Sequence, residues 1–280
     1  MSKDLRASVT TERRGNVVII RFAAPPEGYM FPETEPQLEA ALDFVEGEAG
    51  LSAVILTGGD PGVFIRHFSL EVLHQRAEKL RAKGAEFDLS RPVPEPSLHR
   101  AMRRIETSPL PFIAAINGYC MGGGYELALA CDIRLAEPGD YHIGLPEVRA
   151  GILPGAGGTQ RLKSLIGEAA ALEMILTGTT FPPQEAAARG LVSRVTQGPV
   201  LEEALALADL LAALNPAALA AAKQLVRGSG PDPELMAAER TLFAKVMVSD
   251  AAAARLKDLS AGGDIRAIPP ATTFTSGDLS

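Results

Sequence analysis

The sequence predicts an α/β fold that is followed by a helical C-terminal region. Apolar segments typical of buried strands alternate with amphipathic helical patterns through about residue 195. The first strand, the helix after it and the second strand form a βαβ unit over residues 16–57. From Val200 onward the chain is rich in alanine and leucine, which favour helix rather than more sheet.

Each element is expected from its local pattern. Residues 16–23 and 52–57 are apolar runs of strand length, and residues 35–45 repeat apolar side chains at helical spacing. Further elements are expected in this order: a charged helix at 69–83, a proline-containing loop at 90–96, a helix at 98–105, a strand at 111–116, a short helix after the glycines at 122–124, strands at 132–136 and 191–195, and helices near 200–213, 216–227 and 232–248. We therefore divide the chain into a core at 1–199, a helical region at 200–266 and an irregular tail at 267–280.

The composition excludes several classes of protein. With 280 residues, of which 46% are apolar and 22% charged, the chain can bury a sizeable core and does not resemble a disordered chain. Its net charge is -7 and its basic residues form no long run, so we expect no binding to nucleic acid or to an anionic membrane. A phosphate-bearing small molecule is compatible, because it needs only local positive charge.

The sequence also bears on location. The first fifteen residues lack the apolar stretch of a secretory signal, and Cys120 and Cys131 form no framework of spaced pairs. We therefore expect a cytoplasmic protein whose cysteines are small buried residues. Residues 107–125 carry no charge, but Pro109, Pro111 and four glycines argue against a transmembrane helix there.

Three glycines, Gly122-Gly123-Gly124, open a short helical pattern directly after an apolar strand. Glycine lowers helix stability, so a chain that only needed to pack would do better with alanine. Bare backbone at a helix start lets N–H groups converge on an oxyanion or a phosphate, although close packing or a turn explains this stretch equally well. Nucleotide-binding motifs do not fit, because Tyr125-Glu126 stand in place of a lysine and a hydroxyl, and the later run at 155–160 ends in glutamine.

Two glutamates near these glycines are candidates for proton transfer. Glu126 lies in the first turn of the glycine helix, and Glu147 follows Pro146. Acids are favoured in first turns by the helix dipole and often just face water. Two carboxyl groups beside a backbone oxyanion site could instead move protons between a water and a carbon next to a polarised carbonyl, one as base and the other as acid.

Other catalytic constellations are poorly supported. The four histidines show no ligand spacing and the cysteines form no CxxC motif, so we expect no metal ion. No GxSxG nucleophile elbow occurs. His67, at the exit of an expected strand, could serve in a site, although an isolated histidine is more often structural or solvated.

The order of these motifs resembles the crotonase, or enoyl-CoA hydratase/isomerase, superfamily. Residues 111–137, PFIAAINGYCMGGGYELALACDIRLAE, are similar to its signature, and residues 145–162, LPEVRAGILPGAGGTQRL, to its second block. The likeness continues more loosely through residues 176–195 and covers about residues 10–250. It implies a spiral of repeated ββα units with a C-terminal helical region that mediates trimers, often paired into hexamers.

The resemblance also implies roles for individual residues. The backbone N–H groups of Arg66 and Gly123 would hold the thioester carbonyl of a coenzyme A substrate and stabilise an enolate. Glu126 would act mainly on water and Glu147 mainly on the α-carbon. The residues around these four groups are expected to line the acyl pocket: Ile65, His67, Phe68, Gly122, Tyr125, Pro146 and Gly155. No separate cofactor is implied, because coenzyme A is part of the substrate.

The chain departs from the family pattern at two places. Arg66-His67-Phe68-Ser69 stand where the family has an alanine-glycine-alanine-aspartate run, and His67 in place of glycine restricts the backbone and adds bulk. Residues 21–32 replace the family's arginine-proline and asparagine-alanine-leucine elements, so its adenosine and pantetheine contacts do not carry over.

We therefore predict a cytoplasmic homotrimer or hexamer that adds water across the double bond of a 2-enoyl-CoA. Both glutamates favour hydration, because a double-bond isomerase can work with one carboxylate. One alternative is another reaction on the same enolate platform: isomerisation, thioester hydrolysis, decarboxylation or an aromatic hydratase-lyase reaction. Another is a relative that binds an acyl-CoA without catalysis, which Arg66-His67 favour.

Overall fold

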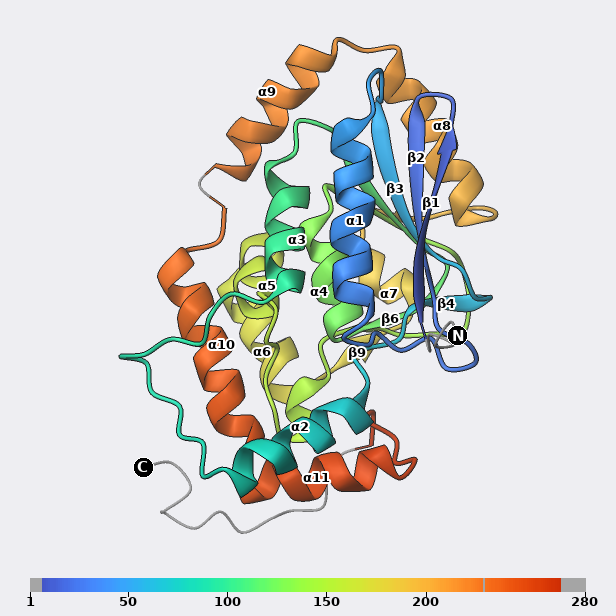
Figure 1. Ribbon diagram of the computed structural model, residues 1–280. Coiled ribbons are helices and arrows are strands. Elements are labelled where there is room, and N and C mark those ends of the chain that lie inside the picture. Colours follow the sequence, from blue (N-terminus) through green and yellow to red (C-terminus); the bar gives the residue numbers. More distant parts are fainter. Residues whose placement is uncertain (1–6, 229, 268–280) are drawn as a thin grey trace, which may run out of the picture.

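The computed structural model describes residues 7–228 and 230–267, whose strands form two sheets (Figure 1). The larger sheet has the order β1-β2-β3-β5-β7-β10 and the smaller has the order β4-β6-β8-β9. Neighbouring strands are parallel except for β1 with β2 and β8 with β9. The strands are β1 (Ser8–Arg14), β2 (Val17–Ala23), β3 (Ala53–Gly58), β4 (Gly62–Ile65), β5 (Phe112–Ile116), β6 (Gly118–Met121), β7 (Ile133–Ala136), β8 (Ile143–Gly144), β9 (Thr180–Phe181) and β10 (Arg194–Val195).

Helices connect and cover these strands, which confirms the predicted α/β fold. The predicted βαβ unit is β2-α1-β3, whose two strands pair in parallel. The helices are α1 (Thr34–Gly47), α2 (Leu70–Ala82), α3 (Ser97–Thr107), α4 (Gly123–Ala130), α5 (Gly158–Ile166), α6 (Glu168–Thr177), α7 (Pro183–Ala188), α8 (Val200–Ala212), α9 (Pro216–Arg227), α10 (Pro233–Met247) and α11 (Asp250–Ser260), and Glu147–Ala150 form a single 3-10 turn.

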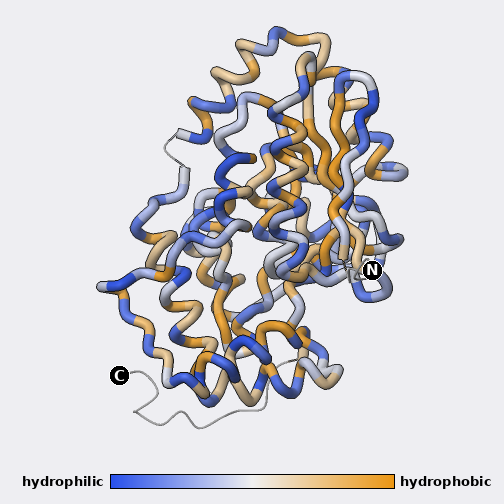
Figure 2. The backbone as a smooth tube through the Cα atoms, in the orientation of Figure 1, coloured by the Kyte–Doolittle hydropathy of each residue, from blue (hydrophilic) through white to orange (hydrophobic). Residues whose placement is uncertain are grey.

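Both faces of the larger sheet are covered. Along β2, Val18 and Ile20 pack into the core that contains α1, α3 and α4, while Val17 and Ile19 pack against α8. Successive side chains of a strand point to opposite faces, so a strand buried on both sides is apolar throughout. The central strands accordingly form a continuous hydrophobic block in Figure 2.

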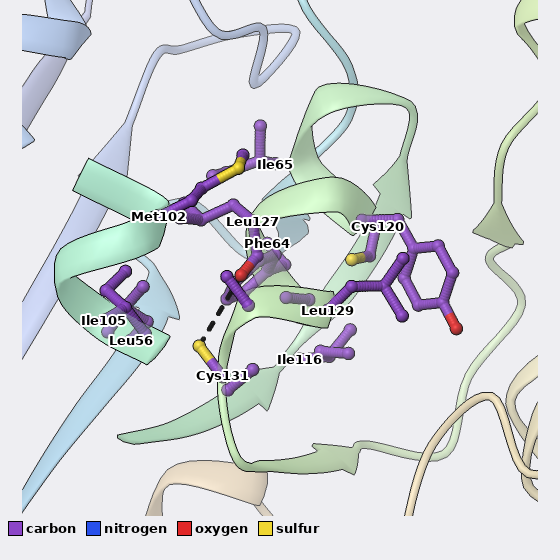
Figure 3. Packing of buried hydrophobic residues seen from close by; sticks show 14 of the residues in the cluster. Leu56, Phe64, Ile65, Met102, Ile105, Ile116, Cys120, Leu127, Leu129 and Cys131 are labelled. Carbon is purple, nitrogen blue, oxygen red and sulfur yellow. Dashed lines mark hydrogen bonds between the residues drawn. The ribbon is translucent and has the colours of Figure 1, made fainter. Parts of the chain in front are cut away.

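Helix α4 lies inside the core. Every residue of this helix after Gly123 is buried, and Figure 3 shows Leu127 in one cluster with Phe64 and Met102. A helix surrounded by protein on all sides is normally apolar all round. Glu126 on this helix must therefore find buried partners or face a cavity, because an unpaired buried carboxylate is costly.

The C-terminal helices run around the outside of the molecule, from α8 beside the larger sheet through α9 and α10 to α11 next to α2 (Figure 1). Helix α9 carries no buried residue, whereas α11 packs on α2, with Leu256 and Leu259 against Leu73 and Ala77. No single helix of the described residues is long and apolar enough to cross a membrane; α8 and α9 reach that size only when joined, and they meet at a bend of 111°. The tail predicted at 267–280 lies outside the described residues except for Ala267.

Some elements differ from the sequence-based expectation. The sequence analysis gives no range for β1, β6, β8, α5, α6, β9, α7 or α11. The first of these, SVTTERR, is an edge strand whose side chains are half-buried or exposed, so it lacks the apolar run of a core strand. The strand expected at 191–195 is limited to Arg194–Val195, because Leu191 and Val192 turn into the core.

Candidate active site

The predicted site lies at the carboxyl ends of two adjacent parallel strands, β4 and β6. The first strand leads into the segment with Phe68, and the second leads into Gly122. Carboxyl ends of parallel strands meet at one edge of a sheet. A cavity of about 210 Å³ lies there, and both predicted acids line it together with Gly122 and Gly123. A larger cavity of about 850 Å³ between α3, α9 and α10 contains none of the predicted site residues.

The three glycines serve three different purposes. Gly122 has φ 51° and ψ -132°, a conformation that side chains rarely adopt, and a Cβ there would lie 3.3 Å from Glu147 Oε1. A Cβ at Gly124 would overlap the carbonyl oxygen of Ile65, so this glycine lets α4 approach β4. Gly123 has neither constraint, since a Cβ there would meet Phe68 only at 3.8 Å. Conformation and packing thus explain the outer two glycines, whereas the middle one leaves bare backbone beside the cavity.

Two backbone N–H groups beside this cavity, at Phe68 and Gly123, are candidate oxyanion donors. Gly123 is the first residue of α4, so its N–H has no acceptor within the helix. Both neighbours of Phe68 bond to Met30, through the His67 carbonyl and the Ser69 N–H at 2.8 Å each, which turns the Phe68 N–H away from Met30. Throughout 7–228 and 230–267, neither amide donates to a protein acceptor. The pair can hold a developing oxyanion.

The predicted donor at Arg66 is wrong. Its N–H donates to the Gly28 carbonyl at 2.8 Å, and its side-chain Nε donates to the Glu27 carbonyl at 2.8 Å. The free N–H lies two residues later, at Phe68. The pairing of β4 with β6 shifts register between Val63 and Ile65, and such an irregularity changes which amides of the following segment point inward.

Most of the predicted pocket residues line the cavity, and two do not. Tyr125 is fully buried in the core, where its hydroxyl donates to the Leu191 carbonyl at 2.9 Å. Ile65 is also a core residue (Figure 3). Their prediction as pocket residues is wrong, because Tyr125 is about 100° around the helix from Glu126 and Ile65 packs against α4. The residues that do line the cavity are His67, Phe68, Gly122, Pro146 and Gly155.

Glu126 is held by the turn that precedes α5. Its Oε1 accepts the N–H groups of Ala156 at 2.8 Å and Gly158 at 2.9 Å. Burial, together with the charge of Glu239, raises its pKa to about 7 in spite of these two donors. Because both amides bind one oxygen, Oε2 is left for a water or a substrate.

Glu147 approaches the same cavity from the 3-10 turn. Its Oε2 is buried and has no hydrogen-bond partner among the described residues. Burial and the neighbouring Glu126 raise the pKa of this carboxyl well above its ordinary value. A raised pKa favours the protonated form of the carboxyl, which can donate its proton.

The unusual His67 is accommodated as a neutral residue. It is buried, its Nδ1 lies 2.9 Å from the Phe68 carbonyl oxygen, and its ring lies 4.8 Å from that of Tyr29. Burial lowers its pKa to about 4, so the imidazole adds no charge to the cavity at pH 7.

The C-terminal region supplies site residues that the sequence analysis missed. Phe243 and Met247 of α10 and Ile265 beyond α11 form part of the apolar cavity wall. Glu239, on the same side of α10, is 4% exposed and hydrogen bonds to the turn that holds Glu126. A signal was present, because Met236, Glu239, Phe243 and Met247 follow helical spacing and one acid interrupts this stripe.

The chain is similar to known proteins over most of its length. The family described as Enoyl-CoA hydratase/isomerase matches residues 12–255. A Bacillus subtilis (strain 168) protein named "Probable enoyl-CoA hydratase" is 35% identical over 216 residues, which are 75% of this chain and 78% of that protein. The fatty acid oxidation complex subunit alpha of Shewanella sp. (strain ANA-3) is 32% identical over 226 residues, which are 79% of this chain but only 30% of that protein.

Solved structures agree with this assignment. An enoyl-CoA hydratase/isomerase from Xanthobacter autotrophicus Py2 is 27% identical, with a TM-score of 0.74 and coverage of 91% of this chain and 94% of that one. The overall fold is therefore shared over about nine-tenths of both chains. The chain belongs to the enoyl-CoA hydratase/isomerase family and has the crotonase fold.

Proposed function

We propose that the protein adds water across the double bond of a 2-enoyl-CoA thioester. The observation that supports this most is that one cavity combines two unbonded amides, at Phe68 and Gly123, with two buried carboxyl groups, Glu126 and Glu147. Hydration moves one proton from water and delivers one to carbon, so it uses an acid and a base. The similarity of this chain to proteins named as enoyl-CoA hydratases also supports the proposal.

The amides act on the thioester carbonyl. Its oxygen accepts the N–H groups of Phe68 and Gly123, which draws electrons from the conjugated double bond and makes the β-carbon electrophilic. As water attacks, the negative charge of the enolate collects on this oxygen. The two N–H groups are fixed by the backbone before the substrate arrives, so they need no rearrangement when the charge develops.

The two carboxyl groups move the protons. The Glu126 carboxylate accepts a proton from water while the water oxygen bonds to the β-carbon, and the π electrons move onto the carbonyl oxygen. The carbonyl then re-forms as the protonated Glu147 gives its proton to the α-carbon. Transfer of a proton from Glu126 to Glu147 restores the starting state. The pKa of about 7 for Glu126 and the strongly raised pKa of Glu147 support these roles.

The direct test is product analysis. Crotonyl-CoA and longer or aromatic enoyl-CoAs are incubated with the protein, and mass spectrometry follows the acyl-CoA. Gain of one water without release of free coenzyme A supports hydration. Release of coenzyme A indicates thioester hydrolysis, loss of carbon dioxide indicates decarboxylation, and a moved double bond indicates isomerisation. Binding without any of these products would favour a non-catalytic acyl-CoA-binding relative.

The activity should depend on pH through Glu126. Its pKa is raised to about 7, so the carboxylate needed as base is lost as the pH falls below that value. We expect kcat/KM to fall about tenfold for each pH unit below the pKa. Rates measured between pH 5 and pH 9 check this expectation, and a rate that is flat from pH 5 to pH 8 would contradict it.

The same shift has a consequence for stability. The pKa of Glu126 is raised in the folded state above its ordinary value of 4.5, so the folded protein binds this proton more tightly than the unfolded chain does. Its stabilising contribution is complete below pH 4.5 and is lost as the pH rises through about 7. Glu126→Gln should therefore reduce the loss of thermal stability between pH 5 and pH 8.

We also infer self-association, as a homotrimer or hexamer. Helix α9 exposes Leu225 (82%) and Val226 (88%), which is unusual for large apolar side chains on a helix. Leu225→Lys should lower the mass measured by light scattering. Leu89→Lys, at a leucine that is 55% exposed on a loop, is the matched control. A monomeric wild-type protein at micromolar concentration would contradict the inference.

A further inference from the structure

Four consecutive amides in the turn into α5 are divided between two carboxyl groups. Ala156 and Gly158 donate to Glu126 Oε1, at 2.8 and 2.9 Å. The alternate amides donate to Glu239: Gly157 to Oε1, and Thr159 to Oε2 at 3.1 Å, with the Thr159 hydroxyl as a further donor to Oε2. The turn is therefore clamped between two acids that come from α4 and α10.

We propose that Glu239 is a positioning residue, which fixes the turn at residues 156–159 so that its amides orient the base Glu126. This inference rests on the proposed function of Glu126. The proposal also gives the C-terminal helical region a part in the chemistry, because Glu239 on α10 contacts a turn that lies 82 residues earlier in the chain.

The turn needs such a support. Gly157 has φ 90°, and Gly155 and Gly158 flank the same short segment, so the backbone has little intrinsic preference for the observed conformation. Without Glu239, the N–H groups of Gly157 and Thr159 would be left unpaired beside the core, which is costly. A rearrangement that paired them elsewhere would move the amides of Ala156 and Gly158 and with them Glu126. A misplacement of about 1 Å is enough to slow a reaction strongly.

Among the described residues, the hydrogen-bond partners of Glu239 all belong to the turn, and it forms no ion pair. Arg161, whose charge lowers the pKa of Glu239, is itself bound to Glu106 at 2.8 and 3.0 Å and to the Ala156 carbonyl. This arginine therefore supports the turn from the opposite side. The charged and titratable groups around the clamp are Glu126 on α4, Glu147 on the 3-10 turn, Arg161 on α5, Glu106 and His99 on α3, and Arg240 on α10.

The simpler explanation is a helix cap. A carboxylate at the N-terminus of α5 would stabilise that helix through its dipole and the first free amides. A cap of this kind affects the melting temperature and leaves kcat at the pH optimum unchanged. A positioning residue next to Glu126 affects both, because it sets the geometry of the base, and its charge contributes, after burial, to the raised pKa of Glu126.

Glu239→Gln tests the proposal. Glutamine keeps the volume and one acceptor for Gly157 but places an NH2 group against the N–H and hydroxyl of Thr159. We expect kcat to fall about tenfold with KM changed less than about twofold, and the acidic limb of the pH profile to move to lower pH, because one negative charge beside Glu126 is gone. Glu234→Gln, at an exposed acid on the same helix, should leave both unchanged.

Thr159→Val is the milder second variant. It removes the hydroxyl donor to Glu239 and keeps the backbone N–H, so it should lower kcat in the same direction by a smaller factor. It also keeps the test decisive if Glu239→Gln fails to fold. Wild-type kcat and an unmoved acidic limb in either folded variant, with or without a lower melting temperature, would overturn the positioning role.

A readout without turnover separates this inference from the proposed function. The pKa of Glu126 can be followed by the 13C shift of its carboxyl carbon, and the exchange of the 156–159 amides by hydrogen–deuterium exchange. Glu239→Gln should lower that pKa and speed that exchange even if no enoyl-CoA is hydrated. If the wild type hydrates no substrate, the proposed reaction is wrong. If Glu239→Gln changes neither the Glu126 pKa nor the exchange of the 156–159 amides, the positioning role of Glu239 is wrong.

Discussion

Replacing Glu147 with glutamine should lower kcat for the hydration of crotonyl-CoA by roughly 10²- to 10⁴-fold. Glutamine keeps the size of the side chain but cannot give a proton to the α-carbon. Among the described residues no group is hydrogen bonded to the buried Glu147 Oε2, and we assign Glu126, the other acid of the cavity, to the water. Steady-state rates, with Glu173→Gln as a control at an exposed glutamate, check the expectation.

The roles of Glu126 and Glu147 can be distinguished by measuring hydrogen exchange at the α-carbon separately from hydration. In deuterated water the deprotonated form of Glu147 can remove and return an α-hydrogen of a saturated acyl-CoA, which exchanges it for deuterium without any attack of water on carbon. Glu147→Gln should abolish this exchange, whereas Glu126→Gln should slow hydration by a similar roughly 10²- to 10⁴-fold and retain more of the exchange. Equal loss of exchange in both variants would contradict the division of roles, and undiminished hydration in both would remove the two acids from the mechanism.

Replacing Gly123 with alanine should lower kcat/KM by roughly 10²- to 10³-fold, the loss expected when an oxyanion donor is blocked. A Cβ at this position would lie 4.0 Å from the Phe68 nitrogen and would occupy space that an oxygen needs to reach both amides. The substitution should not unfold the protein, because no atom would come closer than 3.8 Å and alanine suits a helix.

A glycine outside the cavity serves as the control for the Gly123→Ala substitution. Gly47, at the end of α1, has no atom within 4 Å of an added Cβ, so Gly47→Ala should leave both kcat/KM and the melting temperature nearly unchanged. Circular dichroism and thermal melts of both variants show whether the fold is kept. A folded Gly123→Ala protein with wild-type kcat/KM would mean that no oxyanion forms beside this amide.

The sequence predicted the parts of the site that depend on composition and local order. A glycine run between an apolar strand and a helix indicated bare backbone, whereas Glu126 alone was ambiguous, because an acid in a first turn often just faces water. The structure places Glu126 and Glu147 on one cavity. Residue types and spacing were enough to name these candidates, but their division of roles came from the resemblance to the crotonase superfamily.

The sequence-based predictions failed on two points: the direction in which a backbone N–H group points, and contacts between residues far apart in the chain. Arg66 and Phe68 are two residues apart, and the choice between them depends on which N–H pairs with the segment at Gly28 and Met30. Register of this kind is set by tertiary pairing and can change at a single irregular position. Glu239 was missed for a related reason, because nothing local shows that an acid on α10 reaches the turn before α5.

The geometry favours a functional rather than a stabilising role for these acids. Burial raises the pKa values of Glu126, Glu147 and Glu239; the charge of Glu239 adds to the rise at Glu126, and both neighbours add to the rise at Glu147. A chain selected only to pack would avoid this arrangement. The network of amides around the acids offsets part of this cost. Buried like charges of this kind are typical of sites where proton transfer takes place.

A crystal structure with a bound acyl-CoA thioester tests the central claim most directly. We expect the thioester oxygen to lie roughly 2.7–3.1 Å from the nitrogens of both Phe68 and Gly123, with the α- and β-carbons between the carboxyl groups of Glu147 and Glu126. A thioester whose oxygen faces solvent or the Arg66 segment, with its carbons out of reach of both acids, would contradict the account.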